Sequence, residues 1–322
     1  SMAARSGHRP PRPSPGGVPA YIYAPAIAAA GTLGYCYFRC VDEVPYTGRR
    51  RLLATSPRYE RSLGDRQRDA LLKQFGKDVL PPDHRASVTV RRVGSRIASA
   101  ADRFADRYVP PSYDVRGGNP YTYTVVRSDQ ANAFVLPGNH VFVLTGLFRY
   151  ARDEDELAAV LGHEVAHNLA RHAGERMSGG FLTGVLARLT FLVDPSGVLY
   201  AIFVPATTLL KQLPNSREAE AEADRIGVRL AADACYDPRA AKRVFNAMKA
   251  HEKGSPPEFV STHPSYDTRL SKFDDLMPDA LALYNADGGN RCRGVREDMR
   301  RARRHAAEMA KRREGMSYGV TR

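Results

Sequence analysis

Cysteine is scarce in this sequence, and its basic charge comes without a nucleic-acid-binding motif. Four cysteines occur in 322 residues and none belongs to a C-x-x-C pair, which excludes a disulfide-rich scaffold. The net charge of +13 indicates anionic partners, but no RNA- or DNA-binding fingerprint is present, so we expect no nucleic-acid partner. The length allows one large domain with appendages.

Long uncharged runs are also scarce. Residues 21–38 (YIYAPAIAAAGTLGYCYF) form one such run, which is near the lower length limit for a helix that crosses a bilayer. Tyrosines lie at its two ends, as in the aromatic belts of membrane helices. We expect a transmembrane helix here, with a buried core helix as the alternative. Arginines on both sides leave its orientation open.

Composition divides the rest of the chain into segments. Residues 1–20 are rich in proline, glycine and arginine and are predicted to be disordered. Their first two residues resemble an addition made for expression, so we expect the native N-terminus to be missing. Residues 39–60 are predicted to link the membrane helix to a globular domain over residues 61–290. Residues 291–322 form a basic tail with eleven basic and four acidic residues.

Hydrophobic periodicity predicts a mainly helical α+β fold with a few short strands. A D-x-x-E capping pattern predicts a long helix from Asp153 through His172. The other predicted helices cover residues 65–77, 88–104 and 216–232, with one more after Pro238, and the predicted strands lie within residues 121–128 and 132–148.

The stretch Leu161–His172 reads LGHEVAHNLARH and contains the pattern H-E-x-x-H. On a helix, His163 and His167 are four residues apart and project from one face, so both can bind one metal ion. Glu164 then lies beside the metal and can take a proton from water as a general base. Apolar residues surround the motif, which argues against the alternative of two histidines on a solvated helix face.

Catalytic zinc usually has three protein ligands, and the third is not on this helix. The pattern H-x-x-G-x-x-H would require glycine and histidine where Ala170 and Ala173 stand. His172 is one residue out of that register and is predicted to point elsewhere. The third ligand must therefore come from a later segment.

The segment SREAEAEADRIG, residues 216–227, is the predicted source of that ligand. Glu220 and Asp224 lie beside an apolar helix face, and Gly227 would permit close approach of the neighbouring helix, whereas Glu222 is predicted to point away. We predict that Glu220 is the ligand and that Asp224 steadies a ligand histidine from behind. An exposed acidic helix is the alternative.

With these residues in place, the sequence resembles the gluzincin peptidase family that includes the CAAX prenyl proteases and HtpX. H-E-x-x-H followed by S-R-x-x-E-x-x-A-D-x-x-G matches the family pattern without gaps, and residues 132–148 and 261–270 resemble two further family blocks. The segment EVPYTGRRRL (43–52) after a membrane segment is most similar to mitochondrial inner-membrane members. The resemblance covers about residues 41–290. It implies a zincin-type metallopeptidase domain with one zinc ion per chain between two ligand helices.

The resemblance also implies roles outside the ligand helices. One strand would be an edge strand over the zinc to which an extended substrate adds, with an ordinary core hairpin as the alternative. His263 would be a switch that occupies the open zinc position, a substrate-binding residue or a simple turn residue. Arg269 would stabilise the oxyanion on the scissile carbonyl or form a nearby salt bridge. The predicted substrate-binding strand consists of Val141, Phe142, Val143 and Leu144.

Two apolar stretches and the basic tail have two interpretations each, and one pair of cysteines is a candidate disulfide. The apolar stretches at residues 181–193 and 198–210 are too short to span a bilayer as helices, so they are core helices or a membrane-dipping hairpin. Cys235 and Cys292 are expected to form a disulfide if the domain faces an oxidising compartment such as the intermembrane space. The basic tail is expected to bind anionic lipid, with a solvated helix as the alternative.

Residues and resemblance together imply a membrane-anchored zinc endopeptidase that cleaves inner-membrane proteins or unfolded polypeptides in mitochondrial quality control and stress response. Its expected location is the mitochondrial inner membrane, with the domain facing the intermembrane space, and a homo-oligomer is expected. One alternative is a chaperone-like binding module with a latent or structural zinc. The other is a bacterial-type membrane quality-control protease of the same family.

Overall fold

The structure, a computed structural model, divides into one compact unit up to Val41 and a second from Asp42 onward. The predicted disordered segment and most of the predicted membrane helix lie outside the residues that it describes. Among the described residues, no helix is both long and apolar enough to cross a membrane. The described residues are 28, 31–32, 34–113, 119–201, 214–250, 259, 263, 266–286, 290–302 and 304.

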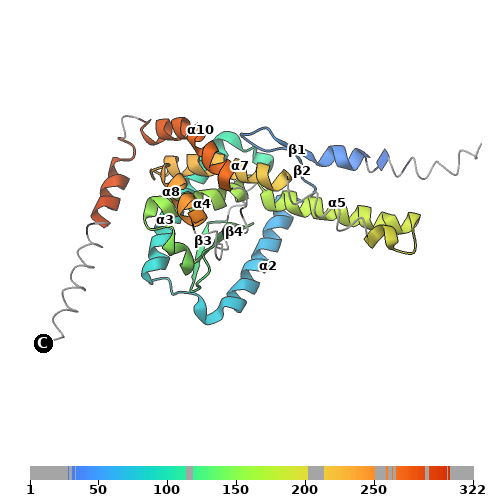
Figure 1. The fold of residues 1–322 in the computed structure, drawn as a ribbon, viewed down its shortest axis with the longest axis horizontal. Coiled ribbons are helices and arrows are strands. Elements are labelled where there is room, and N and C mark those ends of the chain that lie inside the picture. Colours follow the sequence, from blue (N-terminus) through green and yellow to red (C-terminus); the bar gives the residue numbers. More distant parts are fainter. Residues whose placement is uncertain are drawn as a thin grey trace, which may run out of the picture. The chain divides into compact units, whose positions relative to one another are not determined.

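A three-stranded sheet lies beside the helices of the second unit (Figure 1). Its strands are β3 (Thr122–Val126), β4 (Ala133–Leu136) and β5 (His140–Leu144). The predicted pair of strands around a Pro-Gly-Asn turn is confirmed, because β4 and β5 are antiparallel neighbours. Gly138 and Asn139 form this turn at φ 93° and 69°, a region that favours glycine and asparagine.

The prediction that Val141–Leu144 is a substrate-binding edge strand is wrong. The sheet order is β3-β5-β4, so β5 is the central strand. It pairs in parallel with β3 on one side and antiparallel with β4 on the other. All five of its residues are buried, which suits a central strand and leaves no free backbone edge for a substrate.

The two edges of the sheet differ in what covers them. On the outer side of β3, Leu80 donates a backbone hydrogen bond to Val125 and Arg127 donates one to Asp78, so the preceding segment covers this edge. In the described part of the chain, no strand pairs with the outer side of β4. Among the described residues, β4 is therefore the edge strand without a paired neighbour on its outer side, and it packs against the H-E-x-x-H helix.

Helix α4 (Glu154–Leu169) carries the H-E-x-x-H motif through the centre of the unit, and almost all of its residues are buried. The predicted cap is confirmed, because the Asp153 side chain accepts the Glu156 backbone N–H at 2.8 Å. The helix ends at Leu169, however, so the prediction that it runs through His172 is wrong.

The helical conformation is interrupted at Arg171, whose φ of 53° lies in the left-handed region. Its guanidinium donates to Glu60 at 2.5 Å and to the Thr55 carbonyl at 2.8 Å, so buried polar contacts hold the break in place. Helix α5 (His172–Val193) starts directly afterwards. His172 therefore does not continue the helical register of α4. Its position cannot be predicted from its spacing to the other residues of that helix.

Helix α7 (Pro214–Asp233) crosses α4 at two glycines, as the predicted role of Gly227 requires. A Cβ atom on Gly227 would lie 2.8 Å from the Cα atom of His163, and one on Gly162 would lie 2.8 Å from the Gly227 carbonyl oxygen. Real Cβ contacts are essentially never that short. The crossing therefore holds the α7 backbone directly against the ligand-bearing turn of α4.

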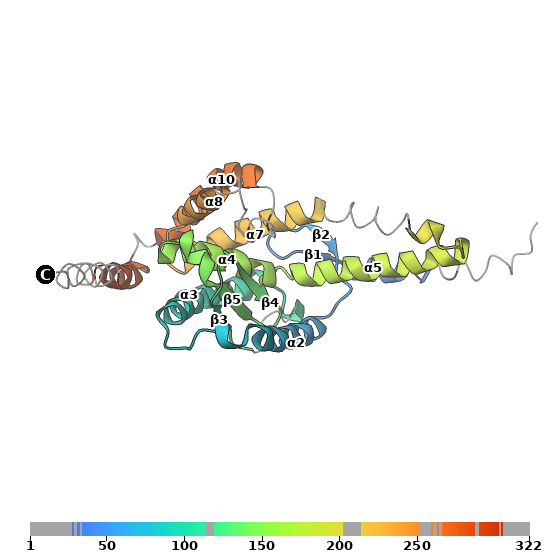
Figure 2. The same ribbon diagram turned by 60° about the horizontal axis from the view of Figure 1, so that its bottom comes forward.

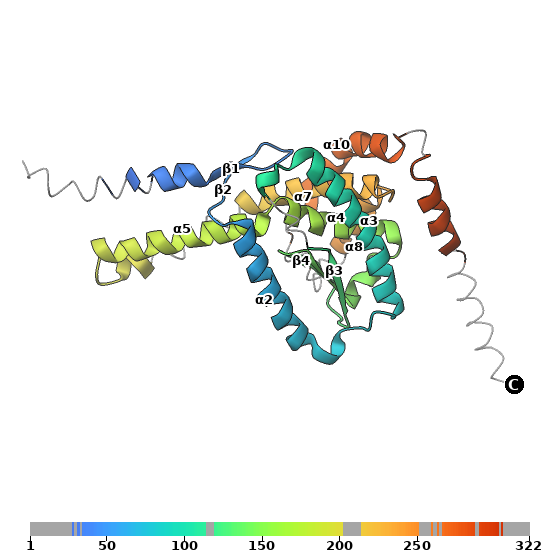
Figure 3. The ribbon, with the colours of Figure 1, turned by 180° about the vertical axis from the view of Figure 1, so that it is seen from behind.

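The second unit begins with a hairpin of β1 (Val41–Glu43) and β2 (Arg50–Leu52), followed by helix α2 (Pro57–Phe75). Its boundary at Asp42 lies within the predicted linker of residues 39–60. Arg51 and Glu60 are buried at 5% and 4% exposure, so this part of the chain is packed into the domain. Figure 3 shows the hairpin beside α5 and α7.

Helix α5 extends away from the rest of the second unit in the ribbon views (Figure 2). Phe181, Phe191 and Val198 expose 68%, 44% and 61% of their surface. This end of the helix is therefore not the core helix that was one interpretation of residues 181–193. Most of residues 198–210 lies outside the described part of the chain.

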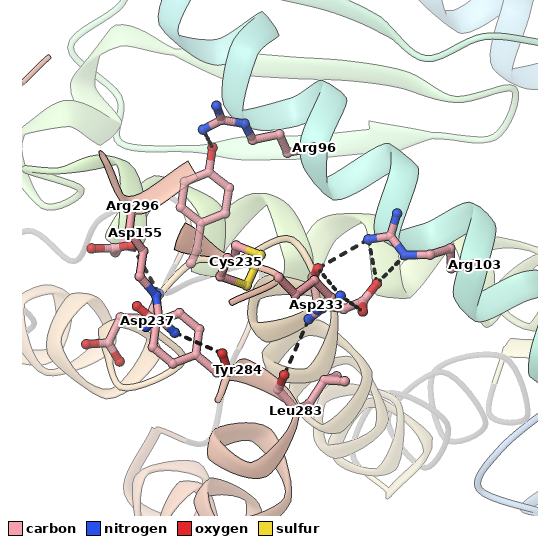
Figure 4. Close-up of a disulfide and its surroundings, with 12 residues drawn as sticks. Arg96, Arg103, Asp155, Asp233, Cys235, Asp237, Leu283, Tyr284 and Arg296 are labelled. Carbon is pink, nitrogen blue, oxygen red and sulfur yellow. Dashed lines mark hydrogen bonds and ion pairs between the residues drawn. A yellow bond between two sulfur atoms is a disulfide. The ribbon is translucent and has the colours of Figure 1, made fainter. Parts of the chain in front are cut away.

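Three further helices and a disulfide belong to the unit. Helices α8 (Ala240–Ala250) and α10 (Tyr266–Tyr284) follow α7 in sequence, and helix α3 (Arg85–Tyr108) packs against α4 and α7. Cys235, directly after α7, forms a disulfide with Cys292, fifty-seven residues later in sequence (Figure 4). Around it, Asp233 pairs with Arg103 and Arg291 at 2.6 Å each.

Candidate metal centre

Three side chains from two helices converge at the α4–α7 crossing. His163 and His167, one turn apart on α4, bring their Nε2 atoms within 3.1 Å of each other. Glu220 from α7 approaches His163 Nε2 at 3.3 Å and His167 Nε2 at 3.4 Å. All three are at least 92% buried, with exposures of 1%, 8% and 4%. The predicted ligand atoms thus lie together in the interior.

His263 completes a cluster in which each residue offers one ligand atom within 4.8 Å of the others. Its Nδ1 atom lies 3.0 Å from both Glu220 carboxylate oxygens and 3.3 Å from His163 Nε2. His263 is 9% exposed and lies within the cluster, so it is not a residue of the surface.

The donor set fits a tetrahedral metal ion. Two imidazole nitrogens and one carboxylate are the protein ligands of one group of catalytic zinc sites, which keep a fourth position open. Here a further imidazole nitrogen, that of His263, lies within 4.8 Å of these ligand atoms. Burial would raise the pKa of Glu220, but its contacts with His163, His167 and His263 outweigh burial and depress the pKa far below its usual range. This carboxylate is therefore ionised, as a ligand must be.

Glu164 lies next to the cluster with an unsatisfied oxygen. Its Oε1 atom is buried and has no hydrogen-bond partner in the described part of the chain; His263 Nε2 is 3.3 Å away. Burial raises the pKa of this carboxyl, although His263 and His163 act in the opposite direction. A buried carboxyl with a raised pKa and a free oxygen is suited to accept a proton and release it again.

His163 is held from behind by Asp224, as predicted. Asp224 Oδ1 lies 3.1 Å from His163 Nδ1. Burial opposes protonation of His163, but the carboxylates of Asp224 and Glu220 outweigh it and raise its pKa to about 9. A metal bound to Nε2 of His163 would replace the proton on that nitrogen. The proton on Nδ1 would remain, in a hydrogen bond to Asp224.

Arg269 has a different set of contacts from those of an oxyanion donor. Its guanidinium forms two hydrogen bonds of 2.7 Å to Asp224, and its Nη1 atom lies 3.1 Å from Glu220 and 3.2 Å from the His263 carbonyl oxygen. This favours the alternative interpretation, a buried salt bridge. The Arg269 guanidinium is directed at the carboxylates of Asp224 and Glu220, which contact the histidines.

His167 has a partner that the sequence did not predict. Its Nδ1 atom lies 2.8 Å from Nδ1 of His172, whose Nε2 atom lies 3.1 Å from Glu222. Helical spacing predicted neither contact. It placed His172 on α4, and it predicted that Glu222 points away from α4. Burial lowers the pKa of both His167 and His172, so each carries one proton at neutral pH. The signal that could have found them is that a buried histidine needs a hydrogen-bond partner.

The model of peptidase family M48 matches residues 89–277, which include every residue of this cluster. The mitochondrial metalloendopeptidase OMA1 of Schizosaccharomyces pombe is 35% identical over 266 residues, covering 81% of this chain and 72% of that protein. The mitochondrial metalloendopeptidase OMA1 of Bos taurus is 33% identical over 259 residues, covering 77% and 48%.

A bacterial protein is also similar. The beta-barrel assembly-enhancing protease of Yersinia pestis is 32% identical over 176 residues, covering 52% of this chain and 36% of that protein. The mitochondrial relatives match a larger share of the chain. The chain therefore belongs to peptidase family M48 and is an OMA1-type metalloendopeptidase.

Proposed function

We propose that this metalloendopeptidase binds one zinc ion through His163, His167 and Glu220 and uses Glu164 as its general base. The observation that carries the proposal is the buried cluster of two imidazoles and a carboxylate, with a buried Glu164 oxygen beside it that accepts no hydrogen bond from the described residues and lies 3.3 Å from His263 Nε2. Zinc bound there would polarise the scissile carbonyl and lower the pKa of a water molecule. No other described group of residues has such a donor set.

Within this proposal, each residue of the chain has one task. Glu164 takes the proton of the attacking water and passes it to the leaving amine, for which its raised pKa is suited. Asp224 holds the ring of His163, and Arg269 holds Asp224 and Glu220. The residues thereby keep the ligand geometry fixed while Glu164 moves the proton.

We propose that the substrate binds as an extended strand on β4. In the described part of the chain, no strand pairs with the outer side of β4, and this strand packs against α4. A peptide added there would be held by backbone hydrogen bonds, which read its side chains only loosely. The expected substrates are accordingly unfolded polypeptides or membrane proteins, in the context of mitochondrial quality control and stress response.

We further propose that His263 keeps the enzyme latent. Its Nδ1 atom lies as close to Glu220 as a fourth ligand would, and its Nε2 atom lies beside Glu164. Ligation by His263 would block the position that a substrate carbonyl or water needs. Activation would then require residues around 263 to move away from the cluster.

The setting of the domain is also part of the proposal. Residues 21–38 would anchor the chain in the mitochondrial inner membrane, with the peptidase domain in the intermembrane space. The disulfide between Cys235 and Cys292 suits that oxidising compartment. The basic tail of residues 291–322 would contact anionic lipid, and the chain would form homo-oligomers. Residues 1–20 would precede the anchor as a disordered segment.

Cleavage of an unfolded protein by the purified chain with zinc tests the proposal. The wild type is expected to cleave, and Glu164→Gln is expected to bind zinc normally and lose nearly all activity, a loss of at least about 100-fold. Equal activity of the two proteins would exclude Glu164 as the base. No cleavage by either, with binding of the unfolded protein intact, would favour a chaperone-like module.

A further inference from the structure

The two ligand histidines are each held from behind, but by different parts of the chain. His163 is held by Asp224, which belongs to the same helix as Glu220. His167 is held by His172 on α5, and His172 in turn contacts Glu222 on α7. Glu222 leads on to Arg49 in the hairpin at the start of the unit. The series of contacts that leads outward from His167 thus includes residues from α5, from α7 and from the hairpin.

The direction of the hydrogen bonds along this chain follows from the metal position. His167 Nε2 faces His163 and Glu220, so it is the atom that offers a lone pair to a metal. Its Nδ1 atom then carries the proton and donates to His172 Nδ1 across 2.8 Å. His172 must carry its own proton on Nε2, from which it donates to Glu222 across 3.1 Å.

Glu222 is held in turn by the hairpin. Arg49 donates to Glu222 Oε2 from Nε at 3.0 Å and from Nη2 at 2.8 Å. Thr47 donates to Glu222 Oε1. Arg49 also forms two hydrogen bonds to Glu175 on α5, of 2.8 and 2.7 Å. The guanidinium therefore ties α5 and α7 together at the point where His172 meets Glu222.

We propose that His172 and Glu222 are positioning residues for the ligand His167, and that Arg49 couples the hairpin of residues 42–52 to the metal centre. This rests on the proposed zinc site. His172 fixes the ring angle and tautomer of His167, while the charge of Glu222 makes His172 the acceptor. Release of Arg49 would leave Glu222 without its cation and would loosen the ligand His167 from a distance, with no substitution in the cluster itself.

Helix α7 provides a matched control for this proposal. Glu218 lies one turn before Glu222 and approaches the same Arg49, at 3.8 Å. Its side chain is 60% exposed, whereas that of Glu222 is 7% exposed. Both substitutions to glutamine remove one negative charge near Arg49, but only Glu222→Gln replaces the carboxylate to which His172 donates with a neutral amide. General electrostatic effects on zinc binding are thus separated from positioning.

The experiment measures zinc affinity by competition with a chelator on the purified full chain at neutral pH. Glu222→Gln is expected to weaken zinc binding about 10- to 100-fold, the usual effect of losing an outer partner of a ligand histidine. Glu218→Gln is expected to match the wild type within about twofold. Equal zinc affinities of Glu222→Gln and Glu218→Gln, with both proteins folded by circular dichroism, would overturn the proposal.

His172 provides a second pair of variants in case Glu222→Gln does not fold. His172→Phe keeps a ring but removes the acceptor, and is expected to weaken zinc binding by a similar factor. His172→Asn retains a side-chain oxygen that can accept from His167, so it is expected to recover part of the affinity. The NMR signal of the His167 Nδ1 proton is expected in the zinc-loaded wild type and absent from His172→Phe. Unchanged affinity in His172→Phe would contradict the proposed positioning.

Failure of this inference differs from failure of the zinc site itself. If Glu220→Ala loses zinc while Glu222→Gln and His172→Phe retain full affinity, the ligand set stands and only the positioning role is wrong. If Glu220→Ala retains zinc, the proposed site is wrong as well.

Discussion

At the scale of single residues, helical spacing predicted the ligand cluster but not the contacts of His172 and Glu222 that support it. Two histidines four apart on a helix must share a face, so the contact between His163 and His167 followed from the sequence. The role of His172 did not follow, because it depends on the left-handed conformation of Arg171, which non-glycine residues seldom adopt. A break of this kind rotates every later residue away from its expected direction.

The latent role of His263 predicts a gain of activity on its removal. His263→Ala is expected to retain zinc and to raise the basal cleavage rate by up to about tenfold, the effect of removing roughly 1.4 kcal/mol of competing ligation. Initial rates with an unfolded substrate at saturating zinc would measure this. A lower rate with unchanged zinc content would instead assign His263 to substrate binding.

The charge of Glu222 predicts a specific sensitivity to acid. Burial opposes its ionisation, but hydrogen bonds from His172, Arg49 and Thr47 outweigh this and lower its pKa from 4.5 to about 2. Because the folded-state pKa is depressed, the stabilisation is present above about pH 4.5 and is lost as the pH falls towards 2.

The stabilisation lost on acidification is on the order of 3 kcal/mol in the free energy of unfolding for the full pKa shift of Glu222. Urea unfolding of the metal-free wild type and Glu222→Gln at pH 7 and pH 3 would measure it. The variant is expected to be less stable at pH 7 and to lose less stability on acidification. The same loss in both proteins would show that Glu222 does not contribute in this way.

At the scale of elements, the sequence predicted the strands but not their order. Alternation and the Pro-Gly-Asn turn identified β4 and β5 correctly. The order β3-β5-β4 depends on a parallel pairing between segments separated along the chain, which no local pattern encodes. The run of four apolar residues in β5, Val141–Leu144, was the available signal, since continuous apolar runs favour central strands.

The glycine crossing of α4 and α7 is the element-scale feature that sets the ligand distances. Gly227→Ala would place a Cβ atom 2.8 Å from the His163 backbone, so the helices must separate. We expect a loss of about 1–3 kcal/mol in the free energy of unfolding and weaker zinc binding. Denaturant unfolding and chelator competition would measure the two effects.

Gly180→Ala on α5 is the matched control, because a Cβ atom there meets nothing within 4 Å. We expect it to be neutral or to stabilise the helix slightly. If Gly227→Ala leaves both stability and zinc affinity at the level of this control, the close crossing does not set the geometry of the site.

At the scale of the whole molecule, the domain starts earlier than composition predicts. The segment of residues 39–60 is rich in arginine and was predicted to be a linker. In the structure, Arg49 lies against carboxylates of α5 and α7 and Arg51 against one of α5. Arg51 is buried and the Arg49 side chain is only 16% exposed, so the hairpin is part of the domain. Charged residues can be buried when each has a partner, and those partners are more than a hundred residues away in sequence.

The disulfide predicts a redox-dependent stability of the whole domain. Cys235 and Cys292 close a loop of fifty-seven residues, for which the chain-entropy estimate is about 4 kcal/mol. Thermal unfolding of the oxidised protein and of the Cys235→Ser, Cys292→Ser double variant would measure the difference. The double variant is expected to unfold at a lower temperature, and an unchanged unfolding temperature would show that the bond contributes no stability.

Metal content of Glu220→Ala tests the central claim most directly, with Glu218→Ala as the matched control on the same helix. Zinc per chain and cleavage rate would be measured on the same preparations. We predict one zinc per chain in the wild type and in Glu218→Ala, and loss of both zinc and cleavage in Glu220→Ala. Full zinc retention in Glu220→Ala would contradict the ligand set on which the account rests.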